Sequence, residues 1–445
     1  MAWIISILST IGIFAAALLI MVFFHELGHF LAAKLFGMRV ERFSVGFPPR
    51  VWGIKKGETD YCIGATPLGG YVKISGMIDE SMDTDHLDEE PKPWEYRSKP
   101  VWQRIIVITA GVIFNMLLAV MIFMGIAFTQ GDVKVPVESV GQVYIQENSV
   151  ADVAGFKTGD QIIGVNGERV QYFSDLVKPV QLTSDELSYM VMRNGDITTV
   201  MVADSLLNRI SKEPFIYPQM AFPARIGHVF SGTPADSAGL AEGDEILSIN
   251  EQEVTYWLQL VELIQGSGEE INLTVRRNGA VKRFKVQPNE ENKIGIGPPA
   301  AQSVFEIQRI SYGLTGSLAF GVDKTVDVTQ GIIQGFSKMF SGSISVRENL
   351  GGPVAIADIT RRATEEGGAL GFWNITAFLS ITLAIMNILP IPVLDGGHLM
   401  FLIYEGITRR EPSPKVRMAL QQLGFILIIA LFIFVTFNDI IRQFG

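Results

Sequence analysis

The sequence predicts a polytopic α-helical membrane protein with four transmembrane helices and an inserted β-rich soluble region. Its 445 residues are 48% hydrophobic and only 18% charged, whereas soluble domains usually contain about 25% charged residues. Four uncharged runs have roughly the length that a helix needs to cross a bilayer, at residues 4–24, 105–128, 369–394 and 419–437. Residues 131–300 are instead acidic, with 14 Lys and Arg against 23 Asp and Glu.

Composition also excludes several classes of protein. The net charge of −10 argues against a nucleic-acid partner. The high apolar content is incompatible with an intrinsically disordered chain. Cys62 is the single cysteine, so neither a disulfide framework nor a cysteine-rich metal site can form.

The first segment, residues 1–36, is predicted to be a transmembrane helix. A cleaved signal peptide is the alternative, but it needs basic residues before the apolar run and a small-residue cleavage site. The first basic residue is Lys34, behind the run, and no Ala-x-Ala site precedes it. We therefore expect the segment to remain as a membrane span.

A metal-binding motif ends this first span, since residues 24–30 read Phe-His-Glu-Leu-Gly-His-Phe. On a helix, His25 and His29 project from one face, and two neutral imidazoles can occupy two tetrahedral positions on Zn²⁺. Glu26 beside them is suited to take a proton from water. A pair of interfacial histidines without a metal is the alternative, but ionisable groups at the edge of an apolar helix are costly unless they are functional. We predict His25 and His29 as zinc ligands and Glu26 as the catalytic base.

Basic residues set the expected orientation. Residues 34–104 contain eleven Lys and Arg, and four more lie between residues 409 and 417. Because cytoplasmic loops are enriched in Lys and Arg, the loop at residues 37–103 should be cytoplasmic. The second transmembrane helix, residues 104–130, then leads to an acidic insert outside the cytoplasm.

Within this insert, two stretches repeat at an offset of 84 residues. Residues 151–167 read ADVAGFKTGDQIIGVNG and residues 235–251 read ADSAGLAEGDEILSINE. A fixed offset with turn residues in register indicates a duplicated module, with β-type runs at Gln161–Val165 and Glu245–Ile249. The pattern resembles PDZ domains, β-rich folds whose edge groove accepts an extended chain. We expect PDZ-like domains at residues 135–210 and 220–300, acting as peptide-binding or gating modules or else as inert spacers.

The remaining segments complete the membrane part. Residues 303–350 show apolar positions at Ile307, Ile310, Leu314 and Leu318, which suit an amphipathic helix lying against the membrane or the insert. Residues 369–408 are predicted as the third transmembrane segment, and residues 416–441 as the fourth transmembrane helix.

The third segment should supply the missing metal ligand. It contains Asn387-Ile-Leu-Pro-Ile-Pro-Val-Leu-Asp395-Gly-Gly-His398, and Asp395 is the only charge between Glu366 and Glu405. An isolated carboxylate there should have a cation as its partner, and irregular backbone around Pro390 and Pro392 is tolerated at membrane depth where it lines a site. Asp395 is therefore our predicted third ligand. His398 is the alternative ligand or a group that orients one. His86 lies in an acidic loop and His228 in the outward-facing insert, so both are poor candidates.

These motifs resemble the site-2 protease family. His-Glu-x-x-His at the end of a first span, together with Asn-x-x-Pro-x-Pro-x-Leu-Asp-Gly before a last span, is the family's pair of metal motifs. The tandem PDZ-like insert is similar to the RseP-like branch, the regulators of sigma-E protease. The resemblance implies a zinc endopeptidase that cleaves transmembrane helices within the bilayer. It also implies a multi-pass protein of the bacterial inner membrane, with the active site near the cytoplasmic side.

The same resemblance implies further site residues and partners. Pro67-Leu-Gly-Gly-Tyr-Val-Lys is similar to the family's membrane-reentrant β-hairpin, in which Gly69 and Gly70 would help position substrate; an ordinary loop hairpin is the alternative. Gly111-Val-Ile-Phe-Asn115 matches the family's second-span motif except that Val112 replaces proline. Asn115 and Asn387 would be polar groups that position substrate, although simple helix packing would also explain Gly111 and Asn115. The implied substrates are single-span proteins, such as an anti-sigma factor stub left by an earlier extracytoplasmic cut.

Two other functions remain possible on the sequence. One is a membrane-anchored PDZ scaffold with a vestigial site, although the motif residues and Asp395 are all intact. The other is a metal transporter, which would need several intramembrane acids or histidines along a path. The sequence contains one compact cluster instead.

Overall fold

The computed structural model describes residues 2–77, 90–176, 187–210, 215, 221–230, 232–342, 345 and 351–444. The chain divides into two units. The first, here called the membrane unit, comprises Met1–Gln130, Tyr312–Ile333 and Val346–Gly445. The second, here called the insert unit, comprises Gly131–Ser311 and Gln334–Ser345.

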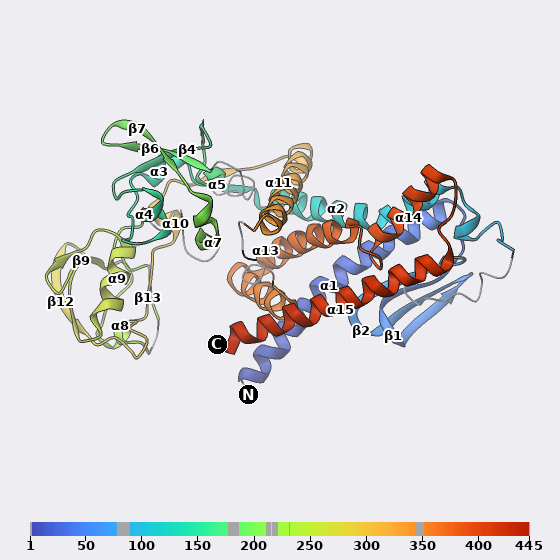
Figure 1. Ribbon diagram of the computed structural model, residues 1–445. Helices are drawn as coiled ribbons and strands as arrows, with labels where there is room; N and C mark the ends of the chain where they lie inside the picture. Colours follow the sequence, from blue (N-terminus) through green and yellow to red (C-terminus); the bar gives the residue numbers. More distant parts are fainter. Residues whose placement is uncertain are drawn as a thin grey trace. The chain divides into compact units, whose positions relative to one another are not determined.

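The membrane unit is built mainly from long helices (Figure 1). Their bounds are α1 Ala2–Leu35, α2 Val101–Gln130, α13 Pro353–Ile388, α14 Asp395–Thr408 and α15 Pro414–Phe444. Helix α11, Leu314–Phe340, belongs to this unit as far as Ile333. In the described part of the chain, four stretches are helical, long and apolar enough to cross a membrane: Ser9–Leu35, Val101–Gln130, Gly367–Ile388 and Lys415–Asp439. The prediction of four apolar helices is confirmed.

Small residues allow these helices to approach closely. At Gly28, a Cβ atom would lie 2.4 Å from the carbonyl oxygen of Ala110, so only glycine permits this contact between α1 and α2. Helix α13 packs against both, with Ala377 and Ile381 fully buried beside Met21 of α1. These contacts place the end of α1 against the middle of α2.

The chain between α13 and α14 folds back sharply. Helix α13 ends at Ile388, just before Pro390 and Pro392, because proline cannot continue a helix. A Cβ atom at Gly396 would lie 2.1 Å from the carbonyl oxygen of Leu389, so the glycine is required for this turn. Residues 369–408, predicted as a transmembrane segment with irregular backbone around the two prolines, comprise the end of α13, a tight loop and α14, which begins at Asp395.

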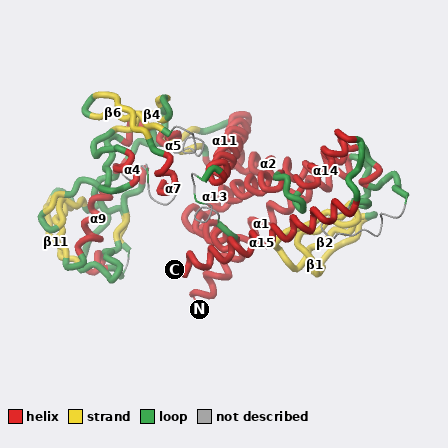
Figure 2. The backbone as a smooth tube through the Cα atoms, in the orientation of Figure 1, coloured by secondary structure: helices red, strands yellow, loops and turns green. Residues whose placement is uncertain are grey.

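A small sheet lies next to α1 in the membrane unit (Figure 2). It is formed by β1 Val40–Lys56 and β2 Thr59–Ile74. Each strand is bent, and its two halves pair separately. Residues 42–45 pair with residues 70–73 on one side and with residues 60–63 on the other. Among the described residues, the run 70–74 pairs only on one side, so it forms an edge of the sheet.

The insert unit contains two four-stranded sheets with the same strand order. One has the order β5-β4-β6-β7 and the other β10-β9-β11-β12. The first comprises β4 Gln161–Val165, β5 Glu168–Arg169, β6 Ser188–Arg193 and β7 Asp196–Met201. The second comprises β9 Glu245–Ile249, β10 Gln252–Glu253, β11 Ile271–Arg277 and β12 Ala280–Val286. The bounds of β4 and β9 match the predicted β-type runs.

Short helices and strands surround these sheets. The helices are α3 Val137–Val140, α4 Val150–Ala154, α5 Phe173–Leu176, α7 Leu207–Ile210, α8 Pro234–Ser237, α9 Trp257–Ser267 and α10 Ala301–Val304. Two further strand pairs are β3 Asp132–Lys134 with β14 Gln308–Ile310, and β8 His228–Val229 with β13 Ile296–Gly297.

The repeated stretches each contain a buried aspartate that makes the same ion pair with an arginine. Asp160 is fully buried and accepts two hydrogen bonds from Arg193, whose Nη2 also donates to the carbonyl of Gly155. Asp244 and Arg277 repeat this arrangement with the same atoms. A buried carboxylate that is paired in this way holds the turn before β4 or β9 against the end of β6 or β11.

One expectation about residues 303–350 is wrong. Ile310 lies in strand β14, which pairs with β3, and Ile307 precedes that strand. The helix begins only at Leu314. The apolar spacing of the two isoleucines therefore does not belong to a helix, because the strand pairing available from β3 decides the local conformation.

Candidate metal centre and catalytic site

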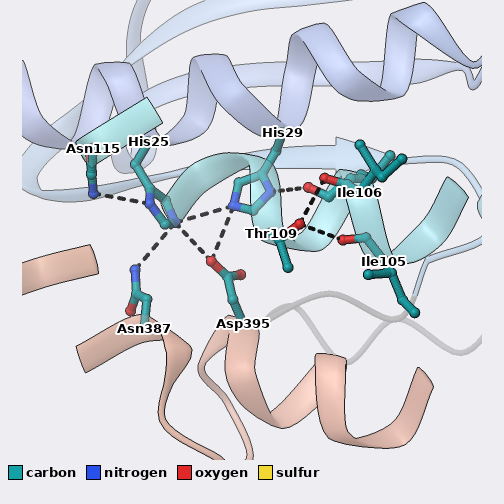
Figure 3. Close-up of polar contacts among 9 residues, drawn as sticks. His25, His29, Ile105, Ile106, Thr109, Asn115, Asn387 and Asp395 are labelled. Carbon is teal, nitrogen blue, oxygen red and sulfur yellow. Dashed lines mark hydrogen bonds and ion pairs between the residues drawn. The ribbon is translucent and has the colours of Figure 1, made fainter. Parts of the chain in front are cut away.

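Three predicted ligands converge in the membrane unit (Figure 3). His25 and His29 project from adjacent turns of α1, and Asp395 comes from the first turn of α14. The Nε2 atoms of the two histidines are 3.2 Å apart. Oδ2 of Asp395 lies 3.2 Å from Nε2 of His25 and 3.4 Å from Nε2 of His29. Both histidines are buried.

These distances fit a metal ion. Ligand atoms at zinc's bond lengths of roughly 2.0–2.1 Å in tetrahedral geometry are about 3.3 Å from one another. Oδ2 of Asp395 is buried, and apart from the two imidazole nitrogens it has no partner among the described residues. The three side chains therefore form a donor set of suitable type and spacing for zinc.

A backbone contact orients His29 for this role. Its Nδ1 lies 2.8 Å from the carbonyl oxygen of Val107 in α2, and a carbonyl can only accept a hydrogen bond. The proton of the neutral ring is thus on Nδ1. Nε2 is left with its lone pair directed at the other two ligands, as a metal ligand requires.

Two asparagines lie on either side of the His25 ring (Figure 3). Nδ2 of Asn115 is 3.2 Å from Nδ1 of His25, and Nδ2 of Asn387 is 3.3 Å from Nε2. Asn115 is fully buried, and its backbone carbonyl accepts a hydrogen bond from Ser380 of α13 at 2.8 Å. Oδ1 of Asn115 has no hydrogen-bond partner in the described part of the chain. Both asparagines predicted from the sequence are thus next to the candidate ligands.

Gly111 allows α2 to pass directly beside the ligands. A Cβ atom there would lie 2.4 Å from Nε2 of His29 and 2.8 Å from Nε2 of His25. Any side chain at this position would displace the imidazoles from their present positions. The glycine of the second-span motif is therefore a requirement of the candidate metal centre as well as of helix packing.

Glu26 faces a cavity of about 620 Å³ that also exposes the three candidate ligands. The walls of the cavity come from α1, α2, α15, the sheet and the loop that precedes α14. The sheet approaches Glu26 at Gly70, where a Cβ atom would lie 2.7 Å from Cγ1 of Val22 and 3.1 Å from Cγ of Glu26. At Gly69, a Cβ atom would lie 2.3 Å from the ring of Phe47. Gly70 is thus required for the close approach of the sheet to α1, whereas a side chain at Gly69 would displace the ring of Phe47.

Comparison with known proteins identifies the family. The profile of peptidase family M50 matches residues 13–431. The chain belongs to peptidase family M50. It is 30% identical to the regulator of sigma E protease of Haemophilus influenzae, over 98% of this chain and 100% of that protein. It is also 30% identical to the regulator of sigma-W protease RasP of Bacillus subtilis, over 95% and 96%. A zinc metalloprotease RasP of Oceanobacillus iheyensis is 28% identical over 98% and 100%.

Family membership confirms the prediction of a site-2-type metalloprotease, and the names of the relatives agree with zinc as its metal. With its four apolar helices, this M50 peptidase is a multi-pass membrane protein. The other histidines are placed differently. His398 lines the same cavity but is outside the ligand group, His228 is exposed in the insert unit, and His86 lies outside the described residues.

Two features of this M50 peptidase site lie outside the motifs that the sequence predicts. Gly424 of α15 packs against the loop before α14, where a Cβ atom would lie 1.9 Å from the carbonyl oxygen of Pro392. Gln421, one turn earlier, lines the cavity. The sequence does contain an indication of Gln421, because an amide in a long apolar run needs a partner. It does not indicate which face of the helix Gln421 occupies.

Proposed function

We propose that this M50 peptidase is a zinc endopeptidase that hydrolyses a peptide bond within a membrane-spanning helix of a single-span protein. One observation carries the proposal: His25, His29 and Asp395 form a zinc-like donor set within a bundle of apolar helices. Ionisable groups in such a place are costly unless they are functional. Zinc is held by these three residues, and Glu26 is the base.

The roles of the side chains follow from their positions. When bound, zinc supplies a Lewis acid that activates water and polarises a carbonyl group. Glu26 takes a proton from the attacking water and delivers it to the nitrogen of the leaving amine. Asn387 lies beside Nε2 of His25, so its Nδ2 donors are available to the carbonyl oxygen of the scissile bond once that nitrogen binds metal.

Asn115 supports His25 in this scheme. With Nε2 of His25 as a metal ligand, the proton of the neutral ring would be on Nδ1, which would then be a donor. A half-turn of the Asn115 amide brings Oδ1, otherwise without a partner among the described residues, to the position now occupied by Nδ2. Oδ1 of Asn115 then accepts a hydrogen bond from Nδ1–H of His25 and fixes the orientation of the ring.

The substrate is bound in an extended conformation at the edge of the sheet. Tyr71, Val72, Lys73 and Ile74 belong to the edge run and line the cavity that contains Glu26. A peptide that pairs with this edge gains backbone hydrogen bonds as its own helix unwinds. We assign this sheet, with Gly69 and Gly70, as the membrane-reentrant element that presents the scissile bond.

The biological setting follows from the relatives. Two of them are named as regulators of sigma-factor systems, which supports an anti-sigma factor as substrate, after a first cut outside the membrane. The Lys and Arg residues of the 34–104 segment support a cytoplasmic position for the sheet. The protein is then located in the bacterial inner membrane, with the insert unit in the extracytoplasmic space.

The insert unit acts as a size filter in this proposal. Its two sheets share a strand order and a buried Asp–Arg pair, which supports their assignment as two PDZ-like modules. The insert directly follows α2, so the extracytoplasmic portion of a substrate must share its compartment. A bulky portion is excluded, whereas a trimmed stub is admitted.

Cleavage of a purified single-span protein by the purified enzyme in detergent tests the proposal. The wild type should cleave within the membrane-spanning segment, and Glu26→Gln should retain zinc but lose turnover by at least about 10³-fold. Loss of zinc from Glu26→Gln, or undiminished cleavage by it, would contradict the assignment.

Removal of residues 135–300 should permit cleavage of untrimmed substrates. If the removal instead abolishes cleavage of trimmed substrates, the insert unit recruits substrate and is not a size filter.

A further inference from the structure

An extended substrate in this cavity presents two rows of backbone groups. In an extended strand, the N–H and C=O groups of successive residues point alternately to opposite sides. Pairing with residues 70–74 satisfies one side only. Inside a bilayer, each unsatisfied backbone group costs several kcal/mol, so the other side also needs donors and acceptors.

Gln421 is placed to supply them. It lies on α15, is 6% exposed, and lines the cavity together with Glu26 and Asp395. Its Oε1 is buried and has no hydrogen-bond partner among the residues that the structure describes. A buried polar atom without a partner is destabilising, which points to a ligand that is bound during the reaction.

The backbone around Gln421 holds it firmly at the cavity. Gly424 packs against the carbonyl of Pro392, so α15 is in close contact with the loop that leads to Asp395. Phe425, one turn after Gln421, lines the same cavity. Gln421 therefore borders the cavity from α15, a wall that the sheet does not form.

We propose that Gln421 binds the backbone of the extended substrate on the side opposite the sheet edge. Oε1 accepts the N–H of one substrate residue, and Nε2 donates to the C=O of the same residue, since both groups of a residue point to one side in a strand. This inference rests on the proposed function and adds a substrate-binding residue to it. Gln421 recognises peptide backbone, so it accepts any sequence that can be unwound.

The adjacent residue provides a matched control. Gln422 follows Gln421 on the same helix but is exposed. Gln421→Leu should lower kcat/KM for a membrane-spanning peptide by about tenfold or more, the expected loss for two hydrogen bonds. Gln422→Leu should leave it unchanged, and both variants should retain zinc. Equal kcat/KM values for the two variants would overturn the proposal.

Replacement of single substrate amides by esters gives a direct readout of backbone hydrogen bonds. In the wild type, ester substitution should slow cleavage at residues of both alternating sets, one set facing the sheet and the other facing Gln421. In Gln421→Leu, the ester at the position that faces Gln421 should no longer have an effect, whereas esters facing the sheet should still slow cleavage. If one alternating set alone is sensitive in the wild type, the substrate has no second backbone partner and Gln421 binds water instead.

Different results would contradict the proposed function and the role of Gln421. If the wild type cleaves no membrane-spanning peptide, the proposed function is wrong. If the wild type cleaves and Gln421→Leu retains both the rate and the full ester pattern, only the role of Gln421 is wrong. Where Gln421→Leu folds poorly, sensitivity of only one alternating set in the wild-type enzyme would still overturn the proposal.

Discussion

Substitution of Gly111 by alanine should disrupt the candidate metal centre without removing a ligand. The new Cβ atom would lie 2.4 Å from Nε2 of His29, whereas ordinary contacts begin at 3.4 Å. Relief of this overlap requires a displacement of about 1 Å, several times the roughly 0.2 Å tolerance of a zinc–ligand bond. We expect the affinity for zinc to fall by about 100-fold or more, since even indirect supporting residues contribute 10–100-fold.

The assay is competition with a chelator on protein purified in detergent, and it measures the dissociation constant for zinc. Gly125→Ala is the matched control, because it lies in the same helix with no atom within 4 Å of the new Cβ. This variant should bind zinc normally and be more stable by about 0.5–1 kcal/mol. If Gly111→Ala retains wild-type affinity, helix α2 does not pass beside the ligands as described.

Two further predictions concern buried ion pairs. Arg104 donates to Glu405 and both are buried, so Arg104→Met should destabilise the membrane unit by about 3–5 kcal/mol in chemical unfolding. Glu58→Gln, which removes a more exposed pair with Lys34, should cost less than about 1 kcal/mol, and similar losses for both variants would contradict the argument. Asp244→Asn should speed hydrogen exchange around β9 and β11 while zinc content stays constant; slow exchange there would show that the pair with Arg277 is dispensable.

Local chemistry made much of this architecture predictable. His25 and His29 are separated by one helical turn on an apolar run, so their common face follows from helix geometry alone. Asp395 stood out because it is a lone charge between prolines and glycines, and the structure brings it to the two histidines. The β4 and β9 strands were predictable because their turn residues, including Asn166 and Asn250, adopt positive φ angles that asparagine tolerates.

Other features depend on contacts between distant segments. Ile310 has the spacing of a helical residue, but its pairing with Asp132 places it in a strand. The need for glycine at position 111 is visible only when α2 lies against His29. The bends of β1 and β2, which expose residues 70–74 as an edge, likewise arise from pairing on both sides of residues 42–45. Such tertiary pairing overrides local preference.

Zinc content of purified Asp395→Ala and Glu26→Gln tests the central claim most directly. After identical dialysis against a weak chelator, Glu26→Gln should retain about one zinc ion per chain, as the wild type does, because Glu26 is a base and not a ligand. Asp395→Ala should retain almost none, because two imidazoles alone hold zinc weakly. If Asp395→Ala keeps its zinc and His398→Ala loses it, the third ligand is His398, and the metal centre described here is wrong.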